Sequence, residues 1–201
     1  MLKELKKKKL WPKKIILPIL VIYLIGILYL VLPSSEIPDL EPALKSVEPG
    51  DTVQLPGVSA YYTNLSRREA IAFFEKAFSH SSFFNLPLVT YRLNHPPEYA
   101  RETIKDTLQT NFYEELIHPL RESLFISGWI PGEDEVYLAK SIKPITDFTI
   151  EGQNFTAKIT LFRVESPIWA RLLIWTGIIL VASVLAWFIV KIIGSPWLKR
   201  K

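Results

Sequence analysis

The chain has 201 residues, enough for one domain of ordinary size with additional segments, and it has no cysteine. The missing cysteines exclude a small fold that is held together by disulfides. Residues 1–14 carry seven lysines and one glutamate, residues 34–167 have seven more acidic than basic side chains, and residues 191–201 carry four basic ones. This division is typical of a membrane protein whose two ends lie on one side of the bilayer, and it is unusual in a uniform soluble domain.

The first apolar run, residues 15–32, contains 18 residues without a charge. A hydrocarbon core of roughly 30 Å needs about 20 helical residues, so the run is close to the length of a membrane span. A cleaved secretory signal is the alternative, but the apolar core of a signal has roughly 7–15 residues and ends in a small-x-small site. Leu32 or Pro33 would occupy the outer recognition position of such a site, and neither is small. The run therefore predicts an uncleaved anchor.

The second apolar run, residues 172–190, has 19 residues without a charge and is followed by Lys191 and a basic tail. Lys and Arg near membrane spans stay in the cytoplasm, so both termini are expected there and residues 34–167 outside the plasma membrane. Each lysine near an anionic leaflet contributes about 1 kcal/mol, so the tails are expected to bind lipid headgroups and no nucleic acid. A long exported region without cysteine suits a bacterial envelope.

Small residues also lie within the second run. Gly177, Ala182 and Ala186 form a face that would let this helix approach another helix closely, in the same chain or in a second copy. Neither run contains a charged side chain, which argues against an ion or proton path.

The segment between the first run and the domain is rich in proline. Residues 33–57 contain five prolines, which fix φ and remove backbone donors, so a single helix or a central strand is not expected. Residues 34–57 are predicted to form an extended stalk that lifts the domain off the membrane. Alternatively, residues 48–57 form a turn and a short edge strand of the domain itself.

Two helices are predicted within residues 58–165. Ser66 and Glu69 fit a capping box at the start of the first helix. Apolar residues follow this box at helical spacing, from Ala70 to Phe78. The second predicted helix begins after Pro96 and Pro97, ends before Pro119, and has an apolar residue at every fourth position. These positions are Ala100, Ile104, Leu108, Phe112 and Leu116.

Apolar and β-branched stretches predict five strands, at residues 58–63, 86–93, 122–130, 136–142 and 155–164. The pattern is clearest in the last one, where apolar and polar residues alternate. The order of elements predicts an α+β domain with a mixed sheet and two helices on one face, for which a ferredoxin-like plait is one arrangement.

The chemistry-bearing residues form no recognisable catalytic or metal motif. His80, His95 and His118 are 15 and 23 residues apart, which is not metal-ligand spacing. The stretch "GVSAY" at residues 57–61 has tyrosine where a nucleophile elbow has glycine, and "GEDE" at 132–135 lacks the spacing of a calcium loop. No catalytic, cofactor-binding or metal-ligating residue is therefore predicted.

The sequence thus predicts a two-span plasma-membrane protein that presents a binding or interaction domain outside the cell. Its partner is expected to be another envelope protein or a second copy of the chain. One alternative is a membrane-anchored enzyme that uses surface carboxylates of the second helix, namely Glu98, Glu102, Glu114 or Glu115. Another is a small subunit of an oligomeric channel or transporter. The predicted parts are a basic tail (1–14), a first transmembrane helix (15–33), a stalk (34–57), an α+β domain (58–165), a second transmembrane helix (168–193) and a basic tail (194–201).

Overall fold

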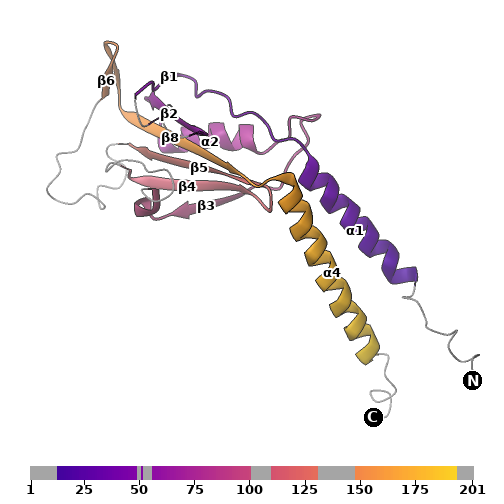
Figure 1. The fold of residues 1–201 in the computed structure, drawn as a ribbon. Coiled ribbons are helices and arrows are strands. Elements are labelled where there is room, and N and C mark those ends of the chain that lie inside the picture. The colour runs from indigo at the N-terminus through magenta and orange to yellow at the C-terminus, as the bar shows by residue number, and fades with distance from the viewer. Residues whose placement is uncertain (1–12, 49–50, 52–55, 101–109, 131–147, 194–201) are drawn as a thin grey trace, which may run out of the picture. The chain divides into compact units, whose positions relative to one another are not determined.

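A computed structural model describes residues 13–48, 51, 56–100, 110–130 and 148–193 of the chain. The chain divides into two compact units (Figure 1). One unit combines Met1–Leu32 with Pro167–Lys201 and contains two helices, α1 (Lys13–Val31) and α4 (Ile168–Ile193). The other unit, Pro33–Ser166, contains the sheet and is the domain described below.

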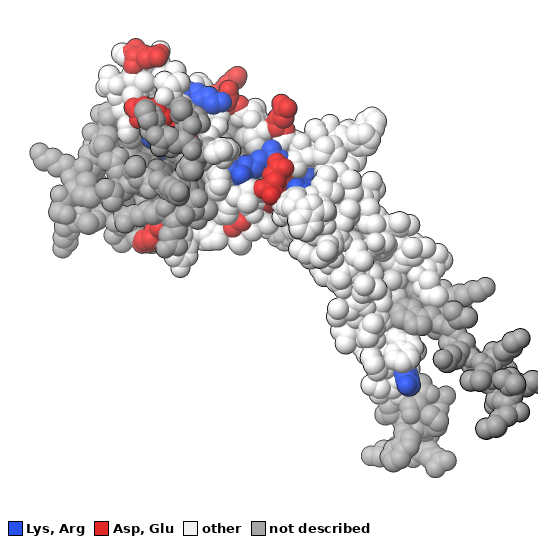
Figure 2. Space-filling model, viewed as in Figure 1, with Lys and Arg blue, Asp and Glu red and all other residues white. Residues whose placement is uncertain are grey.

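Only one described helix is both long and apolar enough to cross a membrane. It is α4, whose apolar stretch covers the 25 residues Ile168–Ile192. The described apolar stretch of α1, Ile16–Val31, is shorter than the length that a span requires. The predicted membrane association is therefore supported by one candidate span, and a second crossing is not established by helix length. On the face that Figure 2 shows, the described surface of the two helices is almost entirely uncharged.

The two helices pack through Gly26 of α1 and Trp175 of α4. A Cβ atom at Gly26 would overlap the indole ring of Trp175, so only glycine allows this close approach. The Trp175 Nε1–H donates to the Tyr23 carbonyl at 3.1 Å, and the Tyr23 and Thr176 hydroxyls lie 3.2 Å apart. Gly177 of the predicted small-residue face is not at this contact, because a Cβ there would meet nothing within 4 Å. The small residue at the contact belongs to the other helix.

The domain is built on one six-stranded sheet with the order β1-β2-β8-β5-β4-β3. Every neighbouring pair is antiparallel, which corrects the predicted mixed sheet. The strand order also differs from that of a ferredoxin-like plait: three strands separate β2 and β3, which are connected through α2, whereas a split βαβ unit has one strand between its two strands. The strands are β1 (Ala43–Lys45), β2 (Val58–Thr63), β3 (Tyr91–His95), β4 (Phe112–His118), β5 (Glu122–Trp129) and β8 (Ala157–Glu165), and a separate hairpin contains β6 (Phe148–Ile150) and β7 (Gln153–Phe155).

Helix α2 (Arg67–Phe78) covers one face of the sheet (Figure 1). It begins with the predicted capping box: the Glu69 backbone N–H donates to the Ser66 side chain, and Glu69 Oε2 accepts from the Ser66 backbone N–H at 2.9 Å. Its apolar side packs into the main core. The core residues of α2 are Ala70, Ile71, Phe74 and Phe78, and those of the facing strands include Leu116, Leu124, Ile126, Ala157, Ile159 and Leu161.

The prediction of a second helix is wrong over its C-terminal part. Residues Phe112–His118 form β4, and before them only a short 3-10 turn, η2 (Pro97–Tyr99), is described. The fourfold spacing of Phe112 and Leu116 is ambiguous, because every fourth residue lies on one face of a strand as well as of a helix. The burial of Glu114 and His118 identifies a strand, because residues 112, 114, 116 and 118 share one face only when side chains alternate. Residues 101–109, with Ile104 and Leu108, lie outside the described residues.

The remaining predicted strands are confirmed to different extents. The predicted strands at 58–63, 122–130 and 155–164 correspond to β2, β5 and β8. The one at 86–93 overlaps β3, which begins only at Tyr91 and continues to His95. The predicted strand at 136–142 and the acidic stretch 132–135 lie outside the described residues.

The predicted stalk is largely part of the domain. Strand β1 pairs with β2, and the preceding Leu40 is buried in the main core. The Tyr61 hydroxyl also donates to Asp39 at 2.7 Å. The prolines rule out a helix and a central strand here, but an edge strand needs hydrogen bonds on one side only.

Candidate functional site

A buried carboxylate, Glu122, lies at the start of β5 and has no exposed side-chain surface. Its Oε1 atom accepts from Ser34 Oγ at 2.6 Å and lies 2.9 Å from His118 Nδ1. Its Oε2 atom accepts from Arg163 Nη2 at 2.5 Å and from Nε at 3.2 Å. Arg121 Nη2 completes the set, 3.4 Å from Oε1 and 3.1 Å from Ser34 Oγ. We call Ser34, Ser35, His118, Arg121, Glu122 and Arg163 the junction cluster.

Strand geometry places these residues together. His118 and Glu122 are direct cross-strand partners at the end of the β4–β5 pair. Alternation along β5 puts Glu122 on the same face as Leu124 and Ile126, the face that α2 covers. Phe78 at the end of α2 stacks on the His118 ring, with a centroid separation of 3.9 Å and an interplanar angle of 7°. The cluster is thus the polar end of an otherwise apolar core.

Opposing effects determine the charge of Glu122. Burial acts to raise the pKa of this carboxyl, but hydrogen bonds from His118, Ser34 and Arg163, together with the Arg163 charge, lower the pKa to about 2. The carboxylate is therefore ionised throughout the physiological range. Its role in the cluster is that of a fixed anion which accepts hydrogen bonds from several surrounding groups.

The cluster joins the two ends of the domain. Ser34 and Ser35 follow Pro33, the first residue of the domain unit, and Arg163 Nη1 donates to the Ser35 carbonyl at 2.9 Å. At the other end, the Ser166 N–H donates to the Arg121 carbonyl at 2.9 Å. The segment that enters the domain and the segment that leaves it are therefore both hydrogen-bonded to residues of the junction cluster.

The distances from Thr90 through His118 to Glu122 are those of a nucleophile, a base and an orienting acid. Thr90 Oγ1 lies 3.1 Å from His118 Nε2, which is within the range for proton transfer. However, His118 is 1% exposed and lies under the Phe78 ring, so no substrate can approach it. The three residues therefore act in packing and hydrogen bonding, and their arrangement does not support a catalytic role.

Two carboxylates of the enzyme alternative, Glu114 and Glu115, lie on strand β4 and not on a helix. Glu114 is fully buried on β4, where it pairs with Arg67 at 2.7 Å and with Arg92. Glu115 lies 2.8 Å from His95 Nε2 of the neighbouring strand. Glu98 is in the η2 turn, and Glu102 lies outside the described residues.

The three histidines are not brought into one site. His80 Nδ1 lies 2.9 Å from Ser79 Oγ, whereas His95 and His118 each pair with a different glutamate. Ser59 of the "GVSAY" stretch is in the middle of β2 and not on a strand-to-helix turn. Across the described ranges, no three His, Asp or Glu residues gather closely enough to hold a metal ion.

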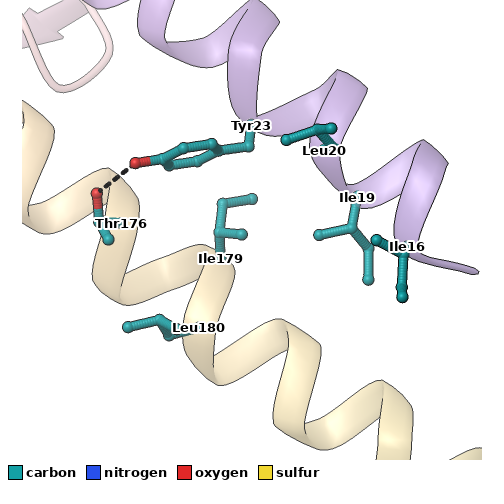
Figure 3. Close-up of a pocket in the computed structure, with 7 residues that line it drawn as sticks. All are labelled: Ile16, Ile19, Leu20, Tyr23, Thr176, Ile179 and Leu180. Atoms are coloured by element: carbon teal, nitrogen blue, oxygen red, sulfur yellow. Dashed lines mark hydrogen bonds between the residues drawn. The ribbon is translucent and has the colours of Figure 1, made fainter. Parts of the chain in front are cut away.

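A cavity of about 360 Å³ lies between α1 and α4 within the helical unit (Figure 3). Its only polar groups are the hydrogen-bonded hydroxyls of Tyr23 and Thr176. Such a lining suits apolar material and offers nothing that would orient a polar substrate. The lining residues are Ile16, Ile19, Leu20, Tyr23, Thr176, Ile179 and Leu180.

Most side chains of β3, an edge strand of the described sheet, are exposed. In the described sheet, β3 pairs only with β4 and has no neighbour on its other side. Tyr91 is 58% exposed and Leu93 45%, and Val89 just before the strand is exposed as well. An unpaired edge with exposed apolar side chains is a surface on which an extended chain can pair.

Sequence reasoning missed the junction cluster, although one signal was present. Within the strand 122–130, alternation puts a charged residue, Glu122, on the core face with Leu124 and Ile126. A charge at a core position requires partners, and Arg163 in the last strand is the corresponding cation.

Comparison with known proteins yields no relative. The chain matches no protein-family model, and neither a curated protein nor a solved structure gives a significant match.

Proposed function

We propose that this chain is a two-span plasma-membrane protein that holds an α+β binding domain outside the cell. In this proposal residues 15–33 and 168–193 cross the bilayer, both termini are cytoplasmic, and residues 34–167 are outside. The length and apolar character of α4, the lysines before the first apolar run and the lack of charge in residues 15–32 and 172–190 support it. The lysine-rich tails then bind anionic headgroups on the cytoplasmic side.

The binding surface in this proposal is the free side of β3. Its partner is an extended segment of another envelope protein, which adds a strand to the sheet. Backbone hydrogen bonds supply affinity in this mode, and the exposed Tyr91 and Leu93 side chains supply specificity. The observation that carries the proposal is the exposure of these two apolar side chains on an unpaired edge strand.

A lysine substitution tests this surface, because a charge on an edge strand opposes the addition of another strand. A photo-crosslinking residue at Tyr91 is expected to give a discrete adduct with a partner protein in native membranes. Leu93→Lys should abolish that adduct. The matched control is Val164→Lys in β8, since Val164 has nearly the same exposure, 43%, but lies in a strand paired on both sides. Equal adducts in both variants would contradict the assignment of the binding surface to β3.

A further inference from the structure

The loop from Ser81 to Leu86 exposes large apolar side chains and contains no charge. Phe84 is 83% exposed, and Phe83 and Leu86 are exposed beside it. Phe84 and Asn85 both adopt positive φ, 53° and 51°, which is rare for residues other than glycine. The loop is closed by a hydrogen bond from the Ser81 N–H to the Leu86 carbonyl at 2.8 Å. It therefore presents a small apolar tip that the domain itself does not bury.

Hydrogen bonds tie this loop to the first residues of the domain. Ser81 Oγ donates to the Pro33 carbonyl at 2.6 Å, and Ser34 and Ser81 form a β-bridge. Ser35 Oγ also donates to the His80 carbonyl at 2.5 Å. Pro33 is two residues beyond Val31, the last residue of α1.

Chain connectivity alone then limits the distance from the loop to the end of α1. Three residues extend at most about 10 Å, so Phe84 lies no further than that from the Ser81 backbone. The headgroup region on each side of a bilayer is roughly 5–8 Å thick. With α1 in the membrane, the apolar tip is therefore close enough to the end of α1 to reach the boundary between headgroups and acyl chains.

The other end of the domain carries a similar feature. Leu120, in the turn between β4 and β5, is exposed and also adopts positive φ, 63°. The backbone carbonyl of the next residue, Arg121, accepts a hydrogen bond from the Ser166 N–H. Helix α4 begins at Ile168, two residues after Ser166. Exposed apolar side chains thus stand beside both points at which the chain leaves the domain.

We propose that the loop 81–86 inserts its phenylalanines into the outer leaflet of the bilayer that the helices cross. This inference rests on the proposed function, because it requires α1 to remain as an anchor. The occupant is lipid because the tip is uncharged, apolar and adjacent to the anchor. Phenylalanine and leucine are residues with which interfacial segments bury their apolar side in the headgroup region.

Site-directed spin labelling tests the proposal, since the full-length chain has no native cysteine. The variants Phe84→Cys, Val47→Cys and Ile25→Cys are labelled with a nitroxide and reconstituted into phosphatidylethanolamine–phosphatidylglycerol vesicles. Power-saturation spectra are recorded with oxygen, which dissolves in lipid, and with a water-soluble nickel chelate on both sides of the membrane. The ratio of the oxygen to the nickel collision rate is expected to be several-fold higher at position 84 than at position 47. Val47 is the control because it is 81% exposed and outside the loop.

The label at Ile25 separates the two proposals. A lipid-like ratio at position 25 with a water-like ratio at position 84 would overturn the loop insertion and leave the anchor intact. A water-like ratio at position 25 would overturn the membrane-spanning role of α1. If position 84 is shielded from both reagents, and the shielding disappears as lipid is added, then copies of the chain cover the loop and the insertion is again wrong.

A second variant guards against an effect of the label itself. With the label moved to Leu86→Cys, replacing Phe83 and Phe84 by serine should lower the oxygen-to-nickel ratio at position 86. An unchanged ratio would show that the phenylalanines do not hold the loop in lipid, and the proposal would fail.

Discussion

An ionised carboxylate without exposed surface, such as that of Glu122, is stable only when other groups replace the hydrogen bonds of water. Here two arginines, a histidine and a serine do so. The buried carboxylate thus has hydrogen-bond partners for both oxygens. These partners come from three parts of the sequence, around residues 34, 118–121 and 163. Removal of any one partner is therefore expected to disturb the two ends of the domain together.

Glu122→Gln is expected to lower the free energy of unfolding of the domain by about 3 kcal/mol or more, because it removes the negative charge that faces the fully buried Arg121 guanidinium. The measurement is chemical denaturation of the full chain in detergent, followed by circular dichroism. Glu165→Gln is the matched control, since Glu165 pairs with the same arginine at 2.8 Å but is half exposed. A loss in the control as large as in Glu122→Gln would contradict the role given to burial.

The lowered pKa of Glu122 also predicts the acid sensitivity of the domain. Unfolding returns the carboxyl to its ordinary value near 4.5, whereas the folded value is about 2. Between these values the unfolded state binds the extra proton, so the Glu122 contribution to stability is complete above pH 5 and is lost as pH falls towards 2. Denaturation measured across this range should show a steeper loss for the native chain than for Glu122→Gln. Parallel curves would exclude Glu122 as the source.

The close contact between α1 and α4 depends on a single glycine facing a tryptophan. Interfaces of this kind let helix backbones approach, and the indole N–H of Trp175 then reaches a backbone carbonyl of α1. A side chain at position 26 must therefore separate the helices or displace the ring. The opposite helix face at Gly177 has no such constraint.

Gly26→Ala is expected to destabilise the helix pair by about 1–3 kcal/mol, the usual cost of overpacking. Gly177→Ala is the matched control, with the same change of residue and helix propensity at a position where the new methyl group has open space. Unfolding of the full-length protein in SDS-containing mixed micelles gives the comparison. Equal SDS resistance of the two variants would contradict the Gly26–Trp175 contact.

The organisation of the chain as a domain with both ends tied at the junction cluster leads to a topology that labelling can check. In the proposed arrangement, single cysteines at Val47 and Ser195 lie on opposite sides of the membrane. An impermeant maleimide is expected to label Val47→Cys in intact cells and Ser195→Cys only after permeabilisation. Val47 suits the test because its side chain is exposed, whereas the neighbouring Ser46 is buried and donates to Asp51.

Opposite labelling would reverse the orientation, and labelling of both positions in intact cells would rule out a second crossing. Mass spectrometry of the intact purified chain distinguishes an anchor from a cleaved signal, because cleavage after the first apolar run would remove the lysine-rich start.

Local features of this protein follow from the sequence alone. The apolar runs of α1 and α4, the capping box of Ser66 and Glu69, and the alternation in β8 involve residues within a few positions of one another. Backbone geometry relates such neighbours directly to one face or one turn, so spacing is sufficient evidence. The same reasoning fails for β4, where a fourfold spacing fits a helix and a strand equally.

Features that depend on contacts between residues far apart in the sequence were decided only by the tertiary structure. The antiparallel order of the sheet, the entry of Leu40 into the core and the placement of Gly26 against Trp175 all join residues far apart in sequence. The junction cluster is the clearest case, since Glu122 meets Ser34 across 88 residues and Arg163 across 41. The sequence shows that a carboxylate occupies a core position of an apolar strand pattern. It does not show which cations and hydroxyls surround that carboxylate, because their identity depends on distances in the folded structure.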